Sequence, residues 1–516
     1  MKFLTISVAL AGVAAYLSAG TGKPDVLRVV NAASFESIIA SSAWISIFGT
    51  NLSLTPRTWA ESDITDNRLP TALDGVSEIN GSLGYLSYIS PTQVNVLVPD
   101  DPAEGIVAVL VSTPQGRSEP FAVKKQSRAP AFFSLDAEQY RYLAAVHADG
   151  AVAAKRNLYD AVRAWPASPG DPILLFGTGL GPTDPPHPAS TMLRAPAPLA
   201  APSSASIGGL PLGISSAALV LPGLYQINVT IPELPDGDHS VVLETAGYRT
   251  PERALSVQGR LIADHTSTDL ARIPDYWLEQ ARQNIRMYFA HTSHGTQITS
   301  GLQRLHSQLG ARYRVALGET LPSVGGALNI LDNGSIYDWN PDFLSGVDRV
   351  LAANPSVNVV MYIWCGQPAK PDWKALFDEY VNGMQALEQR YRRVTFVYAT
   401  GNAQEQDCPG CLRQKFNEEL RKFAKQNNKV LFDFGDLDTW YEGRQNSYAT
   451  PNWCSAYGCT PGLSVPSEHP QWGGGNYNNP CGHASYLSCD NKAKAMWWLL
   501  SRLAGWDGTS STPPAR

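Results

Sequence analysis

Clusters of basic residues are missing from this sequence, which limits the partners that the protein can have. The 516 residues include 40 Lys and Arg against 46 Asp and Glu, a formal net charge of −6, and no stretch concentrates the cations. Nucleic acids are bound through clustered Lys and Arg that neutralise phosphates. We therefore expect no nucleic acid partner.

Long apolar runs are also missing after the N-terminus, where no stretch reaches the roughly 18 residues that a membrane-spanning helix needs. The first 20 residues differ, because Lys2 precedes an apolar run (Phe3–Leu17) and small residues follow it. This pattern is typical of a secretory signal peptide. We expect residues 1–20 to be removed and the mature protein to be secreted or periplasmic, with no membrane span. A retained membrane anchor is the alternative.

Cysteine is absent from the first 360 residues, although seven follow. Because export favours oxidation, we expect three disulfides and one remaining thiol, Cys365. The six bonded cysteines form three close pairs along the chain: Cys408 and Cys411, Cys454 and Cys459, Cys481 and Cys489. Spacing alone does not determine which cysteines bond to one another. A zinc site and a redox motif are alternatives for the sequence "CPGC".

The first half of the chain contains an internal repeat of strand-like segments. Short runs rich in Val, Ile and Leu alternate with turn residues, a pattern typical of all-β structure. "AWISIFGTNLS" resembles the later "DPILLFGTGLG", and "SPTQVNVLVPD" resembles "GLYQINVTIPE". The repeat predicts two related β-sandwiches, at residues 21–128 and 129–258. Their motifs resemble the Ig-like (TIG-like) domain that recurs in secreted acidobacterial proteins, which implies a spacer, binding or adhesion role.

From residue 259 to 508 the pattern changes, because strand-like apolar runs now alternate with helical ones. This alternation predicts an α/β three-layer sandwich with a parallel sheet of about five strands. The expected strands are 285–290, 312–318, 357–365, 393–400 and 429–437, and the expected helices are 298–310, 372–391, 412–428 and 491–506. Residues 509–516 are expected to form a disordered tail.

Polar residues follow four of these strands. They stand in "HTSHG", "WCGQ", "ATGN" and "DFGDLD". Since parallel strands share their carboxyl edge, we expect these groups to meet at one site. Ser293 lies between a strand and a helix, where the helix N-terminus suits a developing oxyanion. A helix N-cap is the alternative role for Ser293.

Over about residues 260–508 this arrangement resembles the SGNH (GDSL-like) hydrolase superfamily, in an uncharacterised secreted subgroup. The resemblance implies that Ser293 is a nucleophile and that His483 is its general base. It also implies that Ser293, Gly366 and Gln367 supply the oxyanion donors. The sequence departs from the family pattern, because "HTSHG" replaces "GDS" and no Asp stands three residues before His483. Asp436 is the expected acid, ahead of Asp433 and Glu468, and a dyad without an acid is the alternative.

Further residues are expected to line the pocket, namely His291, His294, Asn402, Asp433 and Trp364. His291 and His294 could instead bind a metal ion with a third ligand. Cys365, at the end of an apolar strand, is either a thiol nucleophile or, as we expect, an inert buried cysteine.

The sequence thus predicts a secreted serine esterase that needs no cofactor and acts on an acylated carbohydrate or another extracellular ester. Residues 440–482 are rich in aromatic, Gly and Asn residues, which suit stacking on sugar rings. One alternative is a non-catalytic carbohydrate- or surface-binding protein with a degenerate hydrolase domain. A metal-dependent hydrolase is the other. The sequence determines neither the acyl group nor the oligomeric state.

Overall fold

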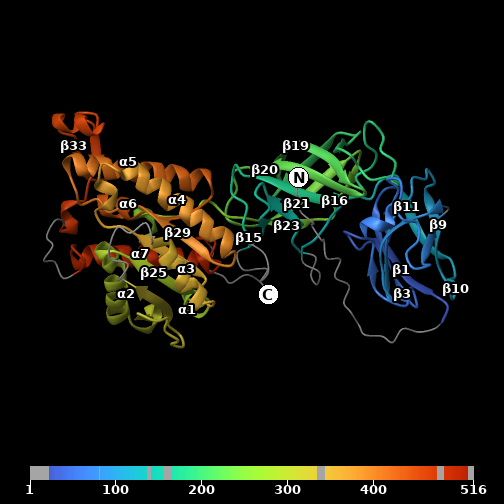
Figure 1. Ribbon diagram of the computed structural model, residues 1–516, viewed down its shortest axis with the longest axis horizontal. Coiled ribbons are helices and arrows are strands. Elements are labelled where there is room, and N and C mark those ends of the chain that lie inside the picture. Colours follow the sequence, from blue (N-terminus) through green and yellow to red (C-terminus); the bar gives the residue numbers. More distant parts are fainter. Residues whose placement is uncertain are drawn as a thin grey trace. The chain divides into compact units, whose positions relative to one another are not determined.

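The computed structural model describes residues 22–80, 82–135, 141–155, 164–333, 343–473 and 481–509. The chain forms two compact units, one ending at Val257 and the other beginning at Gln258 (Figure 1). The predicted signal peptide lies outside the described residues, as does the predicted tail apart from Thr509.

The first unit begins with two facing sheets. One has the strand order β1-β3-β8-β7-β4, and the other has the order β2-β11-β9-β5-β6, with β10 paired to β9. Between them lies a core of mostly β-branched side chains, as expected where a strand buries one of its faces. The strands are β1 (Asp25–Asn31), β2 (Ile38–Ala40), β3 (Trp44–Thr50), β4 (Arg57–Thr58), β5 (Ser77–Asn80), β6 (Ser82–Leu83), β7 (Tyr85–Ile89), β8 (Gln93–Leu97), β9 (Gly105–Thr113), β10 (Gly116–Arg117) and β11 (Phe121–Gln126).

A second group of strands completes this unit. Its main path runs β15-β14-β13-β16-β20-β19-β18-β21-β22, with β12, β17 and β23 paired at its sides. These strands are β12 (Ala131–Phe132), β13 (Ala145–His147), β14 (Val152–Ala153), β15 (Ala164–Trp165), β16 (Pro172–Thr178), β17 (Ala197–Pro198), β18 (Ser203–Ile207), β19 (Leu210–Leu221), β20 (Leu224–Thr230), β21 (Gly237–Thr245), β22 (Tyr248–Arg249) and β23 (Arg253–Val257).

The repeated segments occupy equivalent places in the two groups. β3 pairs antiparallel with β8, and the corresponding β16 pairs antiparallel with β20. The sequence repeat therefore corresponds to a repeat of the central strand pair.

The second unit contains a sheet of seven parallel strands among its described residues. Its order is β24-β30-β29-β28-β25-β27-β26. The strands are β24 (Ile262–Ala263), β25 (Arg286–His291), β26 (Val315–Gly318), β27 (Leu328–Asn333), β28 (Val359–Ile363), β29 (Thr395–Ala399) and β30 (Val430–Phe432). The sequence did not predict β24 or β27, because β24 has two residues and β27 carries polar Asn329 and Asp332.

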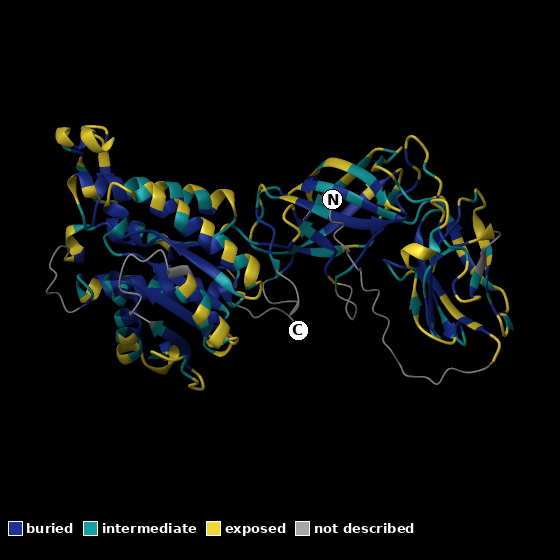
Figure 2. Cartoon of the chain, in the orientation of Figure 1, coloured by how far each residue is buried: buried dark blue, intermediate teal, exposed yellow. Residues whose placement is uncertain are grey.

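Helices cover both faces of this sheet, so its strands are buried on both sides (Figure 2). The first face is covered by α1 (Asp275–Asn284), α2 (Thr296–Leu309) and α7 (Tyr486–Leu503), and the second by α3 (Phe343–Ala353), α4 (Trp373–Arg390) and α5 (Asp407–Gln426). Along β25, Met287 and Phe289 join the first core, whereas Tyr288 and Ala290 join the second. This burial explains the continuous apolar runs of the parallel strands.

The strand order determines where a ligand would bind. Taking β25, β27, β28, β29 and β30 as strands one to five, the order is 2-1-3-4-5. In such open sheets the binding crevice lies at the carboxyl ends of the strands, where the order reverses. Here the reversal falls between β25 and β28.

After β30 the chain forms an excursion before α7. It contains α6 (Phe434–Thr439) and two small hairpins, β31 (Trp440–Tyr441) with β32 (Arg444–Gln445) and β33 (Ser447–Ala449) with β34 (Ser464–Pro466). Two disulfides, Cys408–Cys454 and Cys411–Cys459, join this excursion to α5.

The expected disulfides are confirmed, because all six of those cysteines are bonded and Cys365 is free. Cys408 and Cys411 lie three residues apart on one face of α5, so both reach the excursion rather than each other. Bonded sulfurs leave no thiolates there for zinc. Three disulfides are consistent with an extracellular or periplasmic location. Among the described helices, none is long and apolar enough to cross a membrane.

Candidate functional site

The motif "HTSHG" forms the turn between β25 and α2. Ser293 begins a short 3-10 turn that runs to Gly295 and leads into α2. A Cβ atom on Gly295 would lie 2.2 Å from the Cβ of His291, so only glycine fits there. Ser293 is half-buried, and its hydroxyl donates a hydrogen bond to Cys365 Sγ (3.2 Å) rather than capping the helix.

Cys365 lies opposite this turn, because it follows β28, the strand next to β25 at the position where the strand order reverses. Its half-buried sulfur lies 2.8 Å from His294 Nδ1. His294 is almost fully enclosed, with 1% of its surface exposed. The expected full burial of Cys365 is wrong, because β28 ends at Ile363 and leaves this half-buried residue in the loop beyond the apolar core.

A side-chain amide fixes the orientation of the His294 ring. Nε2 of His294 donates to Gln404 Oε1 (2.6 Å), which can only accept. In the neutral ring Nδ1 is therefore the unprotonated nitrogen, and it faces the sulfur. The arrangement lets His294 take the proton of the Cys365 thiol.

Gln404 is itself held by three groups. Its Nε2 donates to Glu468 Oε1 (3.1 Å) and to the backbone carbonyl of His483 (2.8 Å). Its backbone N–H donates to Asn402 Oδ1, and Asn402 Nδ2 donates to the Cys365 carbonyl (3.0 Å). Asn402, an expected pocket residue, therefore braces the cysteine and the amide together.

The surroundings shift the pKa values of Cys365 and His294 in opposite directions. Burial alone would raise the pKa of Cys365, but the hydrogen bond and charge of His294 lower it below the usual value. Burial alone would lower the pKa of His294, but the contacts with Cys365 and Gln404 raise it. Opposite shifts of this kind are typical of an activated thiol.

Glu468, at the far end of this chain of contacts, has a strongly perturbed carboxyl group. Burial, together with the nearby charge of Asp438, raises the pKa of Glu468 to about 7. Asp438 is itself paired with Lys492, whose Nζ lies 2.6 Å from Oδ1, and both side chains are 1% exposed. Perturbed carboxyls of this kind cluster at functional sites.

The raised pKa of Glu468 predicts a pH-dependent stability. The folded chain holds this proton up to about pH 7, whereas the unfolded chain releases it near 4.5. Stability should therefore fall as pH rises through that window, by on the order of 3 kcal/mol. Glu468→Gln should remove most of this fall, as measured by urea unfolding of the full chain at about pH 5 and about pH 8. The exposed Glu442→Gln is the matched control, and an unchanged pH dependence in Glu468→Gln would refute the assignment.

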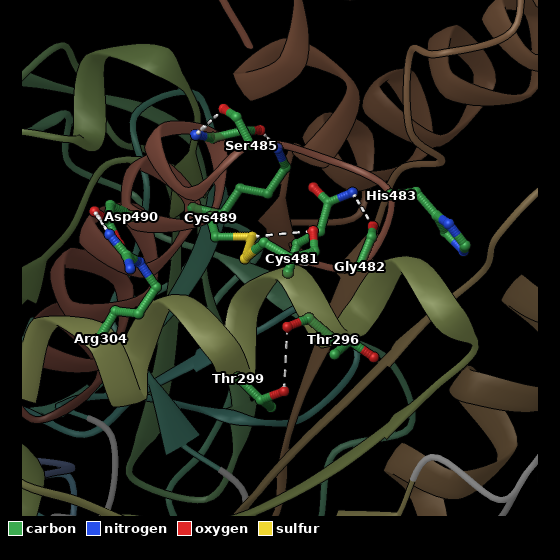
Figure 3. Close-up of a disulfide and its surroundings, with 12 residues drawn as sticks. Thr296, Thr299, Arg304, Cys481, Gly482, His483, Ser485, Cys489 and Asp490 are labelled. Atoms are coloured by element: carbon green, nitrogen blue, oxygen red, sulfur yellow. Dashed lines mark hydrogen bonds and ion pairs between the residues drawn. A yellow bond between two sulfur atoms is a disulfide. The ribbon is translucent and has the colours of Figure 1, made fainter. Parts of the chain in front are cut away.

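His483 lies in a loop that a disulfide closes. The loop is joined by the Cys481–Cys489 bond, and Gln297 Nε2 donates to the Gly482 carbonyl (2.7 Å). Figure 3 shows the His483 ring directed away from this disulfide. His483 has a φ of 72°, uncommon for a residue other than glycine, and its ring lies 5.0 Å from that of His294. His483 thus joins the cluster through its ring contact with His294 and its backbone carbonyl, which accepts from Gln404, whereas the Ser293 hydroxyl bonds to Cys365.

Other expected site residues have different partners from those predicted. The Asp436 carboxylate bonds to His265, with Oδ2 2.5 Å from Nδ1, and so it is not the acid partner of His483. Burial and the charge of Asp433 raise the pKa of Asp436. Asp433 is buried and forms a bidentate ion pair with Arg421 (2.6 and 2.8 Å). These contacts give Asp433 a structural role.

Two further expectations for the pocket also need correction. Trp364 is buried in the second core, where it packs against Tyr362 and Tyr380. His291 is buried with Nε2 2.8 Å from Asp332 Oδ1 and Nδ1 2.7 Å from the Thr292 carbonyl. Successive residues of a strand face opposite sides of the sheet, so residues two apart face the same side. Trp364 therefore points into the same core as Tyr362.

Of the expected oxyanion residues, Ser293 contacts the Cys365 sulfur, and Gly366 and Gln367 directly follow Cys365 in the chain. Gln367 accepts a hydrogen bond from the Cys365 backbone N–H through Oε1 (2.9 Å). Its Nε2 has no protein partner among the described residues. Gly366 precedes it in the same turn.

The described part of the chain contains one group of carboxylate and histidine donors close enough to share a metal ion. It consists of Asp264, His265 and Asp436. His291 and His294 are not in this group, and each of their ring nitrogens already has a protein partner.

No family model and no curated protein matches this chain. One similar solved structure is SGBP-B of the mixed-linkage glucan utilization locus of Bacteroides ovatus with a mixed-linkage heptasaccharide (15% identity, TM-score 0.22, 46% of this chain and 45% of that chain). Another is SGBP-B from a complex xyloglucan utilization locus of Bacteroides uniformis (11%, 0.16, 47% and 51%). A third is the Bacteroides ovatus GH5 xyloglucanase with a XXXG heptasaccharide (11%, 0.17, 52% and 62%).

The chain thus spans less than two thirds of the length of each of these proteins. At such low identities and TM-scores, these similarities indicate nothing about the chemistry of the site, which has to be inferred from the geometry of the site itself.

Sequence reasoning missed Gln404 and His265 as partners, and it named Glu468 only as a possible acid partner of His483. Gln404 stands just after "ATGN", so its place beyond a strand was an available signal. His265 had no signal of this kind, because it follows a two-residue strand.

Proposed function

We propose that the second unit is an acyl hydrolase, similar in layout to the SGNH superfamily, in which Cys365 rather than Ser293 is the nucleophile. The main support for this proposal is the 2.8 Å contact between Cys365 Sγ and His294 Nδ1. Ser293 supports the thiolate by donating its hydroxyl hydrogen to the sulfur (3.2 Å). The proposed substrates are acylated carbohydrates or other extracellular esters.

The proposed reaction proceeds through an acyl-enzyme on sulfur. His294 Nδ1 takes the thiol proton, and the sulfur bonds to the carbonyl carbon of the ester. The C–O bond to the alcohol then breaks, and the departing oxygen takes the proton back from His294. In the second step water gives a proton to His294 and attacks the thioester, which releases the acid and restores the thiolate.

The residues that would hold the tetrahedral oxyanion are those beside the sulfur. The Gln367 Nε2 amide and the Gly366 N–H are the proposed donors, since preorganised donors of this kind lower the barrier. Gln404 would keep the His294 ring oriented through both steps, and Asn402 would keep the Cys365 backbone in place.

The proposal predicts a bell-shaped pH dependence for the hydrolysis of an ester of an alkyl alcohol, such as ethyl acetate. Activity should rise as Cys365 ionises, with a midpoint below the ordinary thiol value of about 8.5, since its pKa is lowered. It should fall at higher pH, where His294 loses the proton that the departing alcohol needs. The chelator EDTA should leave the rate of hydrolysis unchanged. A loss of activity on chelation would favour the metal-dependent alternative. No turnover on a broad ester panel would refute the proposal.

A second candidate is a carbohydrate-binding protein with a degenerate hydrolase domain. It is favoured by two contacts that depart from a serine triad: Asp436 bonds to His265, and Ser293 bonds to Cys365. Binding of polysaccharide by a chain that hydrolyses no ester would favour this candidate.

A further inference from the structure

A hollow of about 250 Å³ opens beside the start of α7 in the second unit. One of its residues, His265, follows β24, so the hollow lies along the same carboxyl edge of the parallel sheet as Cys365. Its walls include His265, Trp440, Tyr441, Trp472, Asn491 and Lys494. None of these residues belongs to the Cys365 cluster.

The aromatic walls of the hollow are held firmly. Trp440 stacks on His265 with ring centroids 4.2 Å apart, and His265 is fixed in turn by the Asp436 carboxylate. Trp472 donates its indole N–H to the Trp440 carbonyl (3.1 Å), and Tyr441 packs edge-on against Trp472. The rings therefore form a preorganised apolar surface, which limits the entropy lost when a ligand binds.

The polar walls have unused hydrogen-bonding capacity. Asn491 and Lys494 lie three residues apart on one face of α7, and both are half-buried. Among the described residues, neither side chain has a protein hydrogen-bond partner or an ion pair. The half-buried amide and ammonium are therefore available to a ligand.

From this combination we propose that the hollow binds a neutral sugar ring of a saccharide. A sugar ring has an apolar C–H face that suits aromatic walls and a rim of hydroxyls that suits the Asn491 amide and the Lys494 ammonium. A purely apolar ligand would leave both polar groups without partners, which costs binding free energy. An anionic ligand would meet the Glu442 and Asp436 carboxylates beside a single lysine.

The hollow is connected to the Cys365 site through two adjacent residues. Glu468 contacts Gln404 at one end, and His469 stacks on Tyr441 at the other, with ring centroids 5.4 Å apart. The idea that the bound saccharide carries the acyl group rests on the proposed hydrolase function. Saccharide binding in the hollow does not depend on that function.

The test measures binding of xylohexaose, cellohexaose and mannohexaose to the full chain by isothermal titration calorimetry. These probes carry no acyl group, so binding is measured without turnover. At least one should bind in a 1:1 ratio, with Asn491→Ala weakening binding about tenfold, the effect of about one lost hydrogen bond. Trp440→Ala should abolish binding. The matched control is Trp453→Ala, which removes an indole that is 66% exposed and outside the hollow and should bind like wild type.

Three results would overturn the inference. These are no binding of any probe at about 1 mM, binding unchanged in both Asn491→Ala and Trp440→Ala, or binding lost in Trp453→Ala. Asn491→Ala keeps the test valid if Trp440→Ala does not fold. Sugar binding together with full esterase activity in Cys365→Ala would support the hollow while refuting the proposed nucleophile. Loss of esterase activity in Cys365→Ala without sugar binding would do the reverse.

Discussion

Cys365→Ala is expected to lower kcat for p-nitrophenyl acetate by about 10⁶-fold, the size of effect seen when the nucleophile of a catalytic triad is removed. The physical reason is that, among the described residues, only Cys365 offers a nucleophilic atom in contact with His294 Nδ1. Steady-state kinetics of the purified full chain provide the measurement, with the folded state checked by circular dichroism.

Ser293→Ala is the matched comparison, because it removes the neighbouring hydroxyl and keeps the thiol. The proposed mechanism predicts a loss of about tenfold, since only one hydrogen bond to the thiolate disappears. The opposite ranking, with Ser293→Ala inactive and Cys365→Ala active, would restore the serine mechanism with His483 as base.

Lys492→Met is expected to lower the free energy of unfolding of the second unit by about 3–5 kcal/mol, because it leaves a buried carboxylate without its counter-ion. Lys492 Nζ lies 2.6 Å from Asp438 Oδ1 and 2.6 Å from Ser488 Oγ. The other Asp438 oxygen accepts the Ala403 N–H (2.8 Å). The pair therefore also holds the backbone beside Gln404, so esterase activity should fall together with stability.

The measurement is urea unfolding of the full chain, followed by tryptophan fluorescence, which reports mainly on the second unit because most tryptophans lie there. Lys494→Met on the same helix is the control, since Lys494 is half-buried and has no ion pair with any residue that the structure describes. It should change stability by no more than about 0.5 kcal/mol. Equal effects of the two substitutions would contradict a stabilising role for the buried pair.

Much of the fold of the second unit could be predicted because its signals are local. β25 and β28 have continuous apolar sequences, as strands buried on both faces require. α4 and α5 repeat apolar residues at helical spacing. β27 escaped prediction because Asn329 is buried in it as a hydrogen-bonded polar residue, which interrupts the apolar pattern.

The sequence predicted which strand ends would meet, but not which side chains would contact one another there. The polar ends of β25, β28 and β29 do converge, as the shared edge of a parallel sheet requires. Which histidine faces which nucleophile depends on loop paths of a few ångströms, and sequence spacing contains no information about them. His294 was expected to line the pocket and His483 to act as base, whereas His294 makes the direct contact with Cys365.

The central claim, that Cys365 becomes acylated during turnover, is tested most directly by acid quenching of the full chain during p-nitrophenyl acetate hydrolysis. Peptide mapping by mass spectrometry then locates the acetyl group. The proposed mechanism predicts an acetyl thioester on Cys365 that is absent from His294→Ala. An acetyl group on Ser293, or turnover in which neither residue is acetylated, would contradict it.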